Sequence, residues 1–307
     1  MIVVTGEALI DLVVETDGSV TAAQGGAPFN TARACGRLGA DVEFIGALSV
    51  DRFGTLMYER LVTDRVAVAR APRVDLPTTL AAGELDERGA ATYRFYIHGT
   101  SATALTDLPT VGDADIAYTG GLGLVLEPMA GTIERWIVDT VHPSGAMVMV
   151  DVNCRPLVIS DRTAYVDRVM RVLAATDIAK VSDEDLEYLF PDRSLDDAAA
   201  TLLEVGPAAV LLTAGGEHVR VITAGGDASV AVEPVEVVDT IGAGDTFGGA
   251  FLAWWTDSGA GRDEAGSLDH LVPAVRAATT IAGIVCSRRG ADPPWRSELA
   301  EDWGPAR

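Results

Sequence analysis

The chain of 307 residues is 48% hydrophobic, which predicts a well-packed globular protein with room for one large α/β domain or two smaller ones. Its 45 acidic and 23 basic residues give a net charge of −22 at pH 7. This charge argues against nucleic acid or an anionic membrane as a partner, because both require a basic surface.

Cysteine usage and the N-terminus point to a reducing compartment. The three cysteines, Cys35, Cys154 and Cys286, are widely spaced and form neither a CxxC pair nor a disulfide framework. The first residues, MIVVTGEALIDLVVE, lack a basic segment, and Glu7 and Asp11 interrupt the apolar run, so they are interpreted as a strand and not as a signal peptide. The apolar runs fall short of a membrane span. We therefore expect a cytoplasmic protein.

Along the chain, short apolar runs rich in β-branched residues alternate with helical patterns. Strands are predicted at residues 2–5, 42–45, 116–119, 147–151, 178–181 and 210–213, and a short apolar strand is expected at residues 237–238. Helices are predicted at residues 28–38, 53–66, 129–141, 165–174, 194–204, 245–257 and 268–286. This alternation predicts an α/β fold over residues 1–307, a single domain in which helices cover both faces of a mostly parallel sheet.

Two stretches, residues 12–24 and 79–99, alternate apolar and polar residues without a following helix. The second contains GELDERGAATYRFY, which is interpreted as a hairpin that turns at residues 86–89. Together they predict a small antiparallel sheet that forms a lid over a cleft. Open edges on such a sheet invite pairing with a second subunit, so the predicted assembly is a homodimer through the lid.

Several common kinds of catalytic site are missing from the sequence. His98, His142, His218 and His270 lie far apart, with no HExxH or HxH pattern, which argues against a zinc site. No GxSxG or GxxxxGK sequence is present. The stretch YTGGLGL at residues 118–124 lacks both the full GxGxxG and the acidic residue of a dinucleotide site, so it is interpreted as a tight turn near a cleft.

The stretch VVDTIGAGDTFGGAFLAW at residues 237–254 combines a glycine turn with the start of an apolar helix. Gly242 and Gly244 permit a tight turn that presents backbone N–H groups, and the helix N-terminus adds a favourable dipole for an anion. Asp245 places a carboxylate at the same point. This carboxylate is either a helix cap or a base beside a bound phosphate.

Three further stretches lie at the ends of predicted strands or at the start of a helix: GGAPFNTARACGRLG (25–39), DVNCRP (151–156) and AKVSDEDL (179–186). Taken singly, they are explained as a glycine turn, a polar loop and an N-cap with an acidic first turn. Taken together with DTIGAGDTF, and in this order, they resemble the PfkB family of sugar kinases over essentially the whole chain. The resemblance implies a ribokinase-like three-layer core with a β lid.

The resemblance also implies the chemistry. It implies transfer of the γ-phosphoryl group of ATP to a sugar hydroxyl, with Mg²⁺ and a monovalent cation such as K⁺ as cofactors. Asp245 would then be the base that takes the hydroxyl proton, and Gly242, Ala243 and Gly244 would supply N–H groups to the transferring phosphoryl group. A carboxylate at a helix N-terminus stays ionised, and phosphoryl transfer requires mainly alignment and charge stabilisation, so the residues suit this assignment.

By the same resemblance, the sugar is expected to contact Asp11, Gly25, Gly26, Asn30, the lid residues Tyr93, Phe95 and His98, and a DxNxR pattern of Asp151, Asn153 and Arg155. The nucleotide is expected to contact Lys180, Ser182, Thr213, Gly215, Asp239, Thr240, Gly242 and Gly244. Asp185 is expected to bind magnesium through water, although the family's NxxE motif here reads Ser-Asp-Glu-Asp and the last residue is shorter. Lys180 is the only lysine of the chain, and its alternative interpretation is a solvated charge at a strand end.

The expected function is an ATP-dependent kinase for a neutral hexose, fructose first. The DxNxR pattern also occurs in 2-keto-3-deoxygluconate kinases, whose acid substrate favours a bidentate arginine. The resemblance implies that in those enzymes the arginine of this pattern shares the carboxylate with an arginine supplied by the lid. In the lid sequence YRFYIHGTSA, strand alternation places Arg94 opposite Tyr93 and Phe95, so Arg94 points away if the aromatic pair faces the sugar. The alternatives are that acid-sugar kinase, a nucleoside kinase of the same fold and a non-catalytic sugar-binding regulator. Asp245 and its anion turn argue against the regulator.

Overall fold

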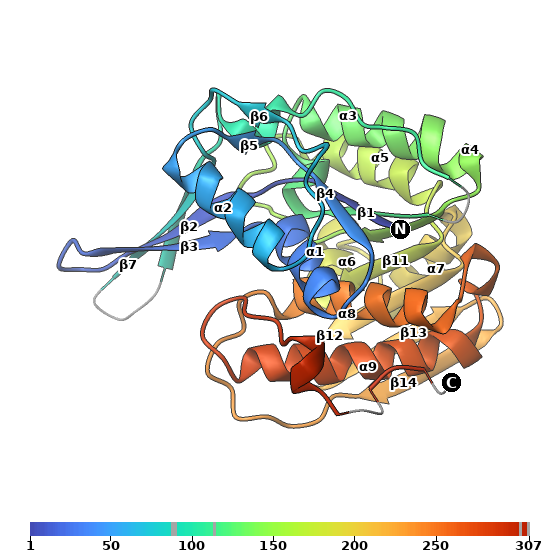
Figure 1. Cartoon of the computed structure of the whole chain (residues 1–307). Coiled ribbons are helices and arrows are strands. Elements are labelled where there is room, and N and C mark those ends of the chain that lie inside the picture. The colour runs from blue at the N-terminus through green and yellow to red at the C-terminus, as the bar shows by residue number, and fades with distance from the viewer. Residues whose placement is uncertain (87–90, 113–114, 301–302, 306–307) are drawn as a thin grey trace.

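An eight-stranded sheet forms the centre of the computed structural model, which describes residues 1–86, 91–112, 115–300 and 303–305 (Figure 1). In spatial order its strands are β14 (Gly226–Ala231), β13 (His218–Thr223), β12 (Ala209–Ala214), β11 (Ile178–Ser182), β10 (Met147–Asp151), β9 (Ile116–Gly120), β1 (Ile2–Thr5) and β4 (Val42–Ile45). The strands from β12 to β4 are parallel, and β13 and β14 extend the sheet antiparallel. The predicted α/β fold is confirmed, whereas β13 and β14 were not predicted as strands.

Helices cover both faces of this sheet (Figure 1). One face carries α1 (Ala27–Arg37), α2 (Arg52–Thr63), α8 (Ala243–Ser258) and α9 (Leu268–Cys286). The other carries α3 (Met129–Trp136), α5 (Arg162–Leu173), α6 (Asp183–Leu189) and α7 (Leu195–Val205). Side chains alternate along each strand, so Val4 and Tyr118 belong to the first apolar cluster and Val3 and Ala117 to the second.

The packing of α1 on α8 is close because α8 carries a glycine at the contact. A Cβ added at Gly249 would lie 2.6 Å from both Thr31 O and the Ala34 Cβ. Glycine therefore lets the two helices that flank the candidate site approach each other directly. The long helix α9 is apolar enough to cross a membrane by length and composition alone, but Leu271 and Ile281 of this helix are fully buried in the sheet core.

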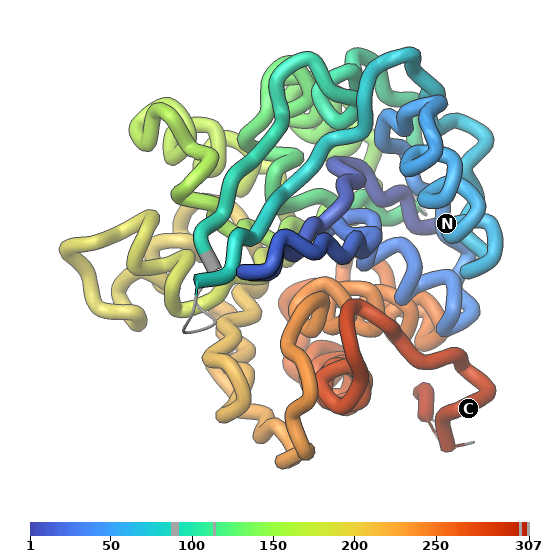
Figure 2. Tube along the Cα trace, turned by 90° about the vertical axis from the view of Figure 1, so that its left-hand side faces the viewer, coloured from blue at the N-terminus to red at the C-terminus, as the bar shows by residue number. Residues whose placement is uncertain are grey.

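The predicted lid is a four-stranded sheet in the order β3-β2-β7-β8. Its strands are β2 (Leu9–Val14), β3 (Val20–Gly25), β7 (Leu80–Leu85) and β8 (Ala91–Tyr96). Figure 2 shows the two hairpins, blue and teal, running side by side. Each hairpin is antiparallel, and they join through parallel pairing of β2 with β7. Most of the predicted turn at 86–89 lies outside the described residues.

Two local predictions need correction. Residues 237–238 are not a strand: they lie in an irregular loop, the Val237 side chain is 61% exposed, and the Val238 N–H bonds to Cys286 O at 2.8 Å. The predicted helix at 129–141 ends as α3 at Trp136 and continues as a π-helical segment, Ile137–Val141, and the short α4, His142–Ser144. The remaining short elements are β5 (Leu48–Ser49), β6 (Arg73–Val74) and 3₁₀ turns at Ser101–Ala104, Gly121–Leu124, Arg262–Glu264 and Arg296–Glu298.

Candidate active site

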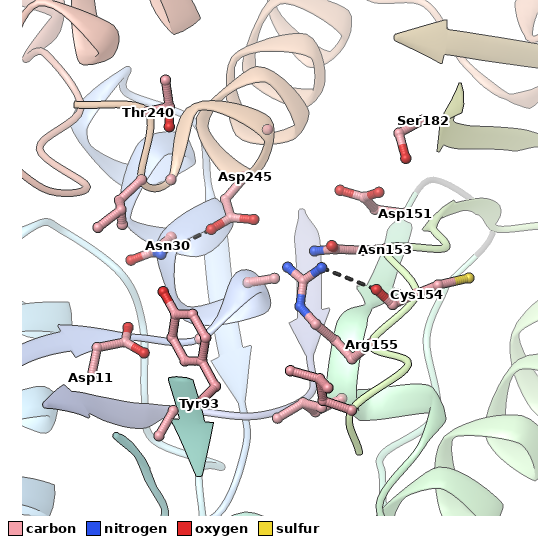
Figure 3. A pocket seen from close by; sticks show the side chains of 18 of the residues that line it. Asp11, Asn30, Tyr93, Asp151, Asn153, Cys154, Arg155, Ser182, Thr240 and Asp245 are labelled. Atoms are coloured by element: carbon pink, nitrogen blue, oxygen red, sulfur yellow. Dashed lines mark hydrogen bonds between the residues drawn. The ribbon is translucent and has the colours of Figure 1, made fainter. Parts of the chain in front are cut away.

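A cleft of about 800 Å³ opens at the carboxyl ends of the parallel strands, beneath the lid sheet (Figure 3). The predicted residues that line it are Asp11, Gly26, Asn30, Tyr93, Phe95, Asp151, Asn153, Arg155, Lys180, Ser182, Asp185, Thr213, Gly215, Thr240, Gly242, Gly244 and Asp245. Strand register explains part of this gathering, because Asp151 pairs with Lys180 and Ser182 pairs with Thr213 across neighbouring strands. Parallel strands end at one edge of a sheet, where α/β proteins place their ligands.

Four predicted residues lie outside the lining of the cleft. His98 is exposed beyond the end of β8. Gly25 packs against Asp11, since a Cβ at Gly25 would lie 2.1 Å from the Asp11 Oδ2. Asp239 accepts hydrogen bonds from the N–H groups of Ile241 and Gly290, at 3.0 and 2.8 Å. Ala243 is the first residue of α8. The roles expected of these four residues stay predictions.

Asp245 lies in the first turn of α8, directly after the glycine turn. Gly242 is the N-cap of this helix and has a φ of +75°, a conformation that glycine adopts without strain. The Asn30 Nδ2 of α1 donates to the Asp245 Oδ2 at 2.9 Å, and the Thr31 hydroxyl donates to the Asp245 backbone carbonyl at 3.1 Å. Helix α1 therefore holds Asp245 through both its carboxylate and its backbone carbonyl.

Burial raises the pKa of Asp245 to about 6, the hydrogen bond from Asn30 lowers it, Asp151 raises it, and the charges of Lys180 and Arg155 lower it. The carboxylate is thus mostly ionised at neutral pH, as the helix dipole predicts, but it is more basic than an exposed aspartate. A general base is most effective when its pKa lies near the working pH.

Lys180 forms a buried ion pair with Asp151. The Lys180 Nζ lies 2.8 Å from the Asp151 Oδ2, and the two side chains are 7% and 1% exposed. The pair adjoins the glycine turn, since a Cβ at Gly244 would lie 3.5 Å from the Lys180 Nζ. Lys180 is therefore not a solvated charge at a strand end. The Asp151 Oδ1 is buried and accepts no hydrogen bond from any described residue, as is true of the Asn30 Oδ1.

Asp185 and Ser182 form a capping box at the start of α6. The Ser182 hydroxyl accepts from the Asp185 N–H at 3.0 Å, and the Asp185 Oδ2 accepts from the Ser182 N–H at 2.8 Å. The other Asp185 oxygen accepts from the Cys154 N–H at 2.6 Å. Asp185 thus fastens the 151–156 loop to α6. Among the described residues, no group of three or more His, Cys, Asp or Glu side chains could enclose a metal ion.

Two aromatic side chains of β8 and Arg155 also line the cleft. The Tyr93 and Phe95 rings stack with centroids 6.3 Å apart and line the cleft, whereas the exposed Arg94 bonds to the Glu84 Oε1 at 2.9 Å. The predicted alternation of this strand is confirmed. Figure 3 shows the Arg155 guanidinium pointing into the cleft, and its Nη1 donates to Cys154 O at 3.1 Å. Burial and the Asp245 charge raise the pKa of Asp11 to about 6.

Sequence reasoning missed Glu7 as a part of the cleft wall. Its buried carboxylate accepts from the Ala27 N–H at 3.1 Å and from the Gly123 N–H at 3.0 Å, so it ties the start of α1 to the turn after β9. Burial raises the pKa of Glu7 to about 7, although the hydrogen bonds from its own N–H and from the Ala27 N–H lower it. The available signal was a carboxylate in an apolar run at the end of the first strand.

Comparison with known proteins supports a sugar kinase. A model of the pfkB family of carbohydrate kinases matches residues 1–298. A fructokinase of Rhizobium leguminosarum bv. trifolii is 35% identical over 260 residues, covering 82% of this chain and 79% of the relative. Among solved structures, aminoimidazole riboside kinase from Salmonella enterica, complexed with aminoimidazole riboside and an ATP analog, matches with a TM-score of 0.82 and 25% identity, covering 94% of each chain.

A fructokinase double mutant from Vibrio cholerae, with fructose, ADP and potassium ion bound, has a TM-score of 0.84 and 24% identity over 94% of this chain and 93% of that chain. At this identity the likeness concerns the fold, whereas the family match and the Rhizobium relative concern the activity. The glycine turn, Asp245 and the cleft beneath the lid agree with both. The chain therefore belongs to the pfkB family of carbohydrate kinases, enzymes that phosphorylate sugars.

Proposed function

We propose that this enzyme transfers the γ-phosphoryl group of ATP to a hydroxyl of a neutral hexose, fructose first. The observation that carries the proposal is Asp245, which Asn30 orients beside the Gly242–Gly244 turn at the N-terminus of α8. The proposed unit is a single kinase domain over residues 1–307, with residues 12–24 and 79–99 as its lid. The fructose and the ATP analog bound in the similar enzymes support this choice of substrates.

In this proposal the sugar lies on the lid side of the cleft. Asp11 accepts hydrogen bonds from its hydroxyls, and the Tyr93 and Phe95 rings cover it. The buried Asn30 Oδ1, which has no hydrogen-bond partner among the described residues, accepts another. Asp245 accepts the proton of the attacking hydroxyl. The N–H groups of Gly242 and Gly244, at the N-terminus of α8, stabilise the charge of the transferring phosphoryl group and need no reorganisation, whereas the Ala243 N–H already donates to Thr240 O at 3.2 Å.

Hydrated magnesium fits the strand-end side of the cleft. The Asp151 Oδ1 is buried and accepts no hydrogen bond from the described part of the chain. The Asp185 oxygens already accept backbone hydrogen bonds, which favours contact through water over direct ligation. Asp151 and Asp185 would hold the ion there, and it would neutralise phosphate charge.

A dependence on K⁺ is proposed only by analogy with the potassium-bound fructokinase. The three cysteines are free thiols, which supports the proposed cytoplasmic location. Pairing of lid edges in a homodimer also remains our proposal.

We expect a neutral hexose to be preferred over an acid sugar. Among the described residues, Arg155 and Lys180 are the cations that line the cleft, and Lys180 is already paired with Asp151. We therefore expect kcat/KM for fructose to exceed that for 2-keto-3-deoxygluconate by at least about tenfold, a difference of about 1.4 kcal/mol in transition-state binding. ADP release measured with ATP, magnesium and a sugar panel tests this. A preference for the acid sugar would contradict it, and a preference for a riboside would favour the nucleoside kinase.

We expect activity to fall in acid with an apparent pKa near 6. Asp245 must be ionised to accept a proton, and its pKa is raised to about 6, so kcat/KM should decline as the pH falls through this value. Because the pKa of Asp245 is higher in the folded protein than in the unfolded chain, protonation of Asp245 stabilises the fold in acid. This contribution to the free energy of unfolding is lost as the pH rises through about 6. The measurement is kcat/KM from pH 4.5 to 9, repeated with Asp11→Asn because Asp11 titrates in the same range. A flat profile would argue against Asp245 as the base.

A further inference from the structure

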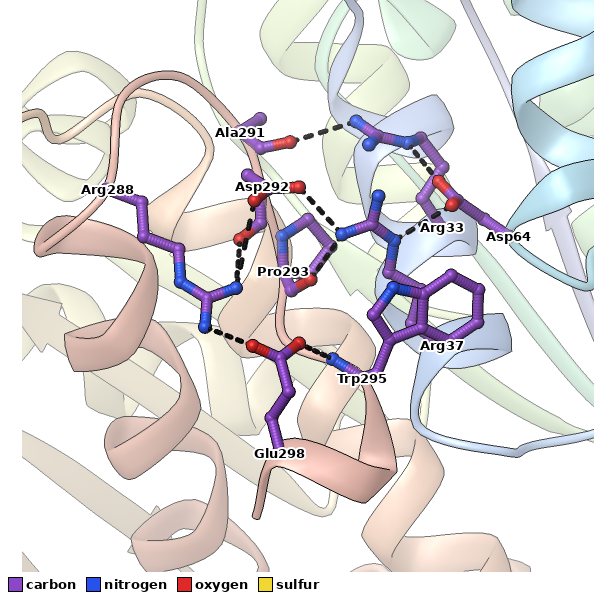
Figure 4. A network of polar contacts seen from close by, with 9 residues as sticks. All are labelled: Arg33, Arg37, Asp64, Arg288, Ala291, Asp292, Pro293, Trp295 and Glu298. Carbon is purple, nitrogen blue, oxygen red and sulfur yellow. Dashed lines mark hydrogen bonds and ion pairs between the residues drawn. The ribbon is translucent and has the colours of Figure 1, made fainter.

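Two arginines on α1 form a buried network away from the cleft (Figure 4). The Arg33 Nε donates to the Asp64 Oδ2 at 2.7 Å, and the Arg37 Nε donates to the Asp64 Oδ1 at 2.8 Å. The Asp64 side chain at the end of α2 is fully buried, and both arginines are nearly so. One carboxylate thus orients two guanidinium groups that lie one helical turn apart.

The same arginines reach the segment that follows α9, which we name the 290–293 loop. The Arg33 Nη1 donates to Ala291 O at 2.9 Å. The Arg37 Nη1 donates to the Asp292 Oδ1 at 2.7 Å and to Pro293 O at 2.6 Å. On its other side Asp292 lies 3.7 Å from the Arg288 Nη1. The loop is therefore held by charged donors on specific backbone and side-chain oxygens.

The 290–293 loop packs directly behind the glycine turn. A Cβ added at Gly242 would lie 2.4 Å from the Ala291 Cβ, so the two segments are in contact without room for a side chain. The Gly290 N–H also donates to the Asp239 Oδ2 at 2.8 Å, and the other oxygen of Asp239 accepts from the Ile241 N–H. A displacement of this loop would therefore move the turn.

We infer that Arg33 and Arg37 are positioning residues that fix the glycine turn relative to the sugar-binding helix. Asn30 and Arg33 lie one helical turn apart on α1. Asn30 holds Asp245, which follows the glycine turn in the chain, and Arg33 holds Ala291, which packs against Gly242 of that turn. The inference rests on the proposed role of the Gly242–Gly244 turn in phosphoryl transfer. It adds that the position of this turn is set by α1, through two side chains that touch neither substrate.

A purely structural role explains the network less well. A buried ion pair is weak evidence for stability, because apolar side chains of similar volume often serve as well or better. A packed apolar contact would still leave the loop free to shift along α1, whereas the planar guanidinium groups bond particular carbonyl and carboxylate oxygens in a fixed geometry. Phosphoryl transfer depends on the alignment of donors and nucleophile, so this geometry bears on the rate.

The test compares Arg33→Met with a matched control, Arg262→Met. Arg262 makes the same kinds of contact, from its Nε to the Asp177 Oδ1 at 2.8 Å and from its Nη1 to His142 O at 3.2 Å. Asp177 directly precedes β11, so it lies at the amino end of this strand, whereas the cleft lies at the carboxyl ends of the strands. Well below the Tm of each variant, we expect Arg33→Met to lower kcat/KM for ATP by about tenfold with KM for fructose changed less than about twofold. Arg262→Met should leave both constants near wild type.

Equal kinetics of the two variants would overturn the inference, even if both lower the Tm. If Arg33→Met does not fold, Asp292→Ala replaces it, because this side chain is 49% exposed and its loss removes one of the two contacts that the Arg37 Nη1 makes with the loop, while the bond to Pro293 O remains. It should lower kcat/KM for ATP by about threefold, and wild-type kinetics would again overturn the inference. The affinity for a non-hydrolysable ATP analog should fall in Arg33→Met and not in Arg262→Met. Binding of the analog requires no turnover, so it tests the inference even if the wild type is inactive on sugars. Such inactivity would refute the proposed function and leave the inference to be judged by the binding result.

Discussion

Replacing Asp245 with asparagine is expected to lower kcat by about 10²–10⁴-fold, the range for loss of a general base. Asparagine has the same shape and can still accept the hydrogen bond that the Asn30 Nδ2 donates at 2.9 Å. It has no basic oxygen to take the proton of the sugar hydroxyl. Steady-state kinetics with saturating ATP and fructose, together with calorimetric ADP binding, separate lost chemistry from lost nucleotide affinity.

The stability of this variant supplies the control for folding. Burial raises the pKa of Asp245, which means that its ionised form costs stability above pH 6. Asp245→Asn removes this cost, so its Tm at pH 8 should equal or exceed that of the wild type. Inactivity together with a Tm that does not fall would place the defect in the chemistry. Near-normal turnover would contradict the role of Asp245 as the base.

The sequence was sufficient for the glycine turn and for the strand ends because both have local signals. Gly242 and Gly244 directly precede an apolar period, and the structure begins α8 at Ala243. Asp151 ends one short apolar strand and Lys180 lies within the next, and parallel register brings them together. The orientation of Tyr93 and Phe95 also followed from the two-residue period of a strand. Features that are encoded by a short sequence period or by residues next to one another in the chain could therefore be predicted.

Features that depend on distant partners could not be predicted in this way. Val237 and Val238 have the composition of a strand, but they lie beside the end of α9 and not beside a sheet edge, so they remain in an exposed loop. Arg33 bonds to Ala291, 258 residues away, and nothing local distinguishes it from a surface arginine on an amphipathic helix. Glu7 likewise gains its role from Ala27 and Gly123, which only the fold brings near.

The burial of Lys180 changes what its removal should do. In the structure its ammonium is paired with Asp151, lies beside the glycine turn and lowers the pKa of both Asp151 and Asp245. Among the described residues that line the cleft, Arg155 is the other cation that can attract the phosphates of ATP, so Lys180 should contribute strongly at short range. Loss of a donor preorganised for a developing charge typically costs about 10²–10³-fold in kcat.

We therefore expect Lys180→Ala to raise KM for ATP by about tenfold or more and to lower kcat/KM for ATP by about 10²-fold or more. Lys180→Met keeps most of the side-chain volume, so an effect common to both variants is due to the lost charge and not to a cavity.

The pH profile gives a second measurement. Lys180 lowers the pKa of Asp245, so without it that pKa should rise above about 6 and the acid limb of kcat/KM should move to higher pH. Because a raised KM alone would also follow from a distorted cleft, the joint shift of KM and acid limb is the decisive result. An unchanged acid limb with unchanged KM would reduce Lys180 to a structural partner of Asp151.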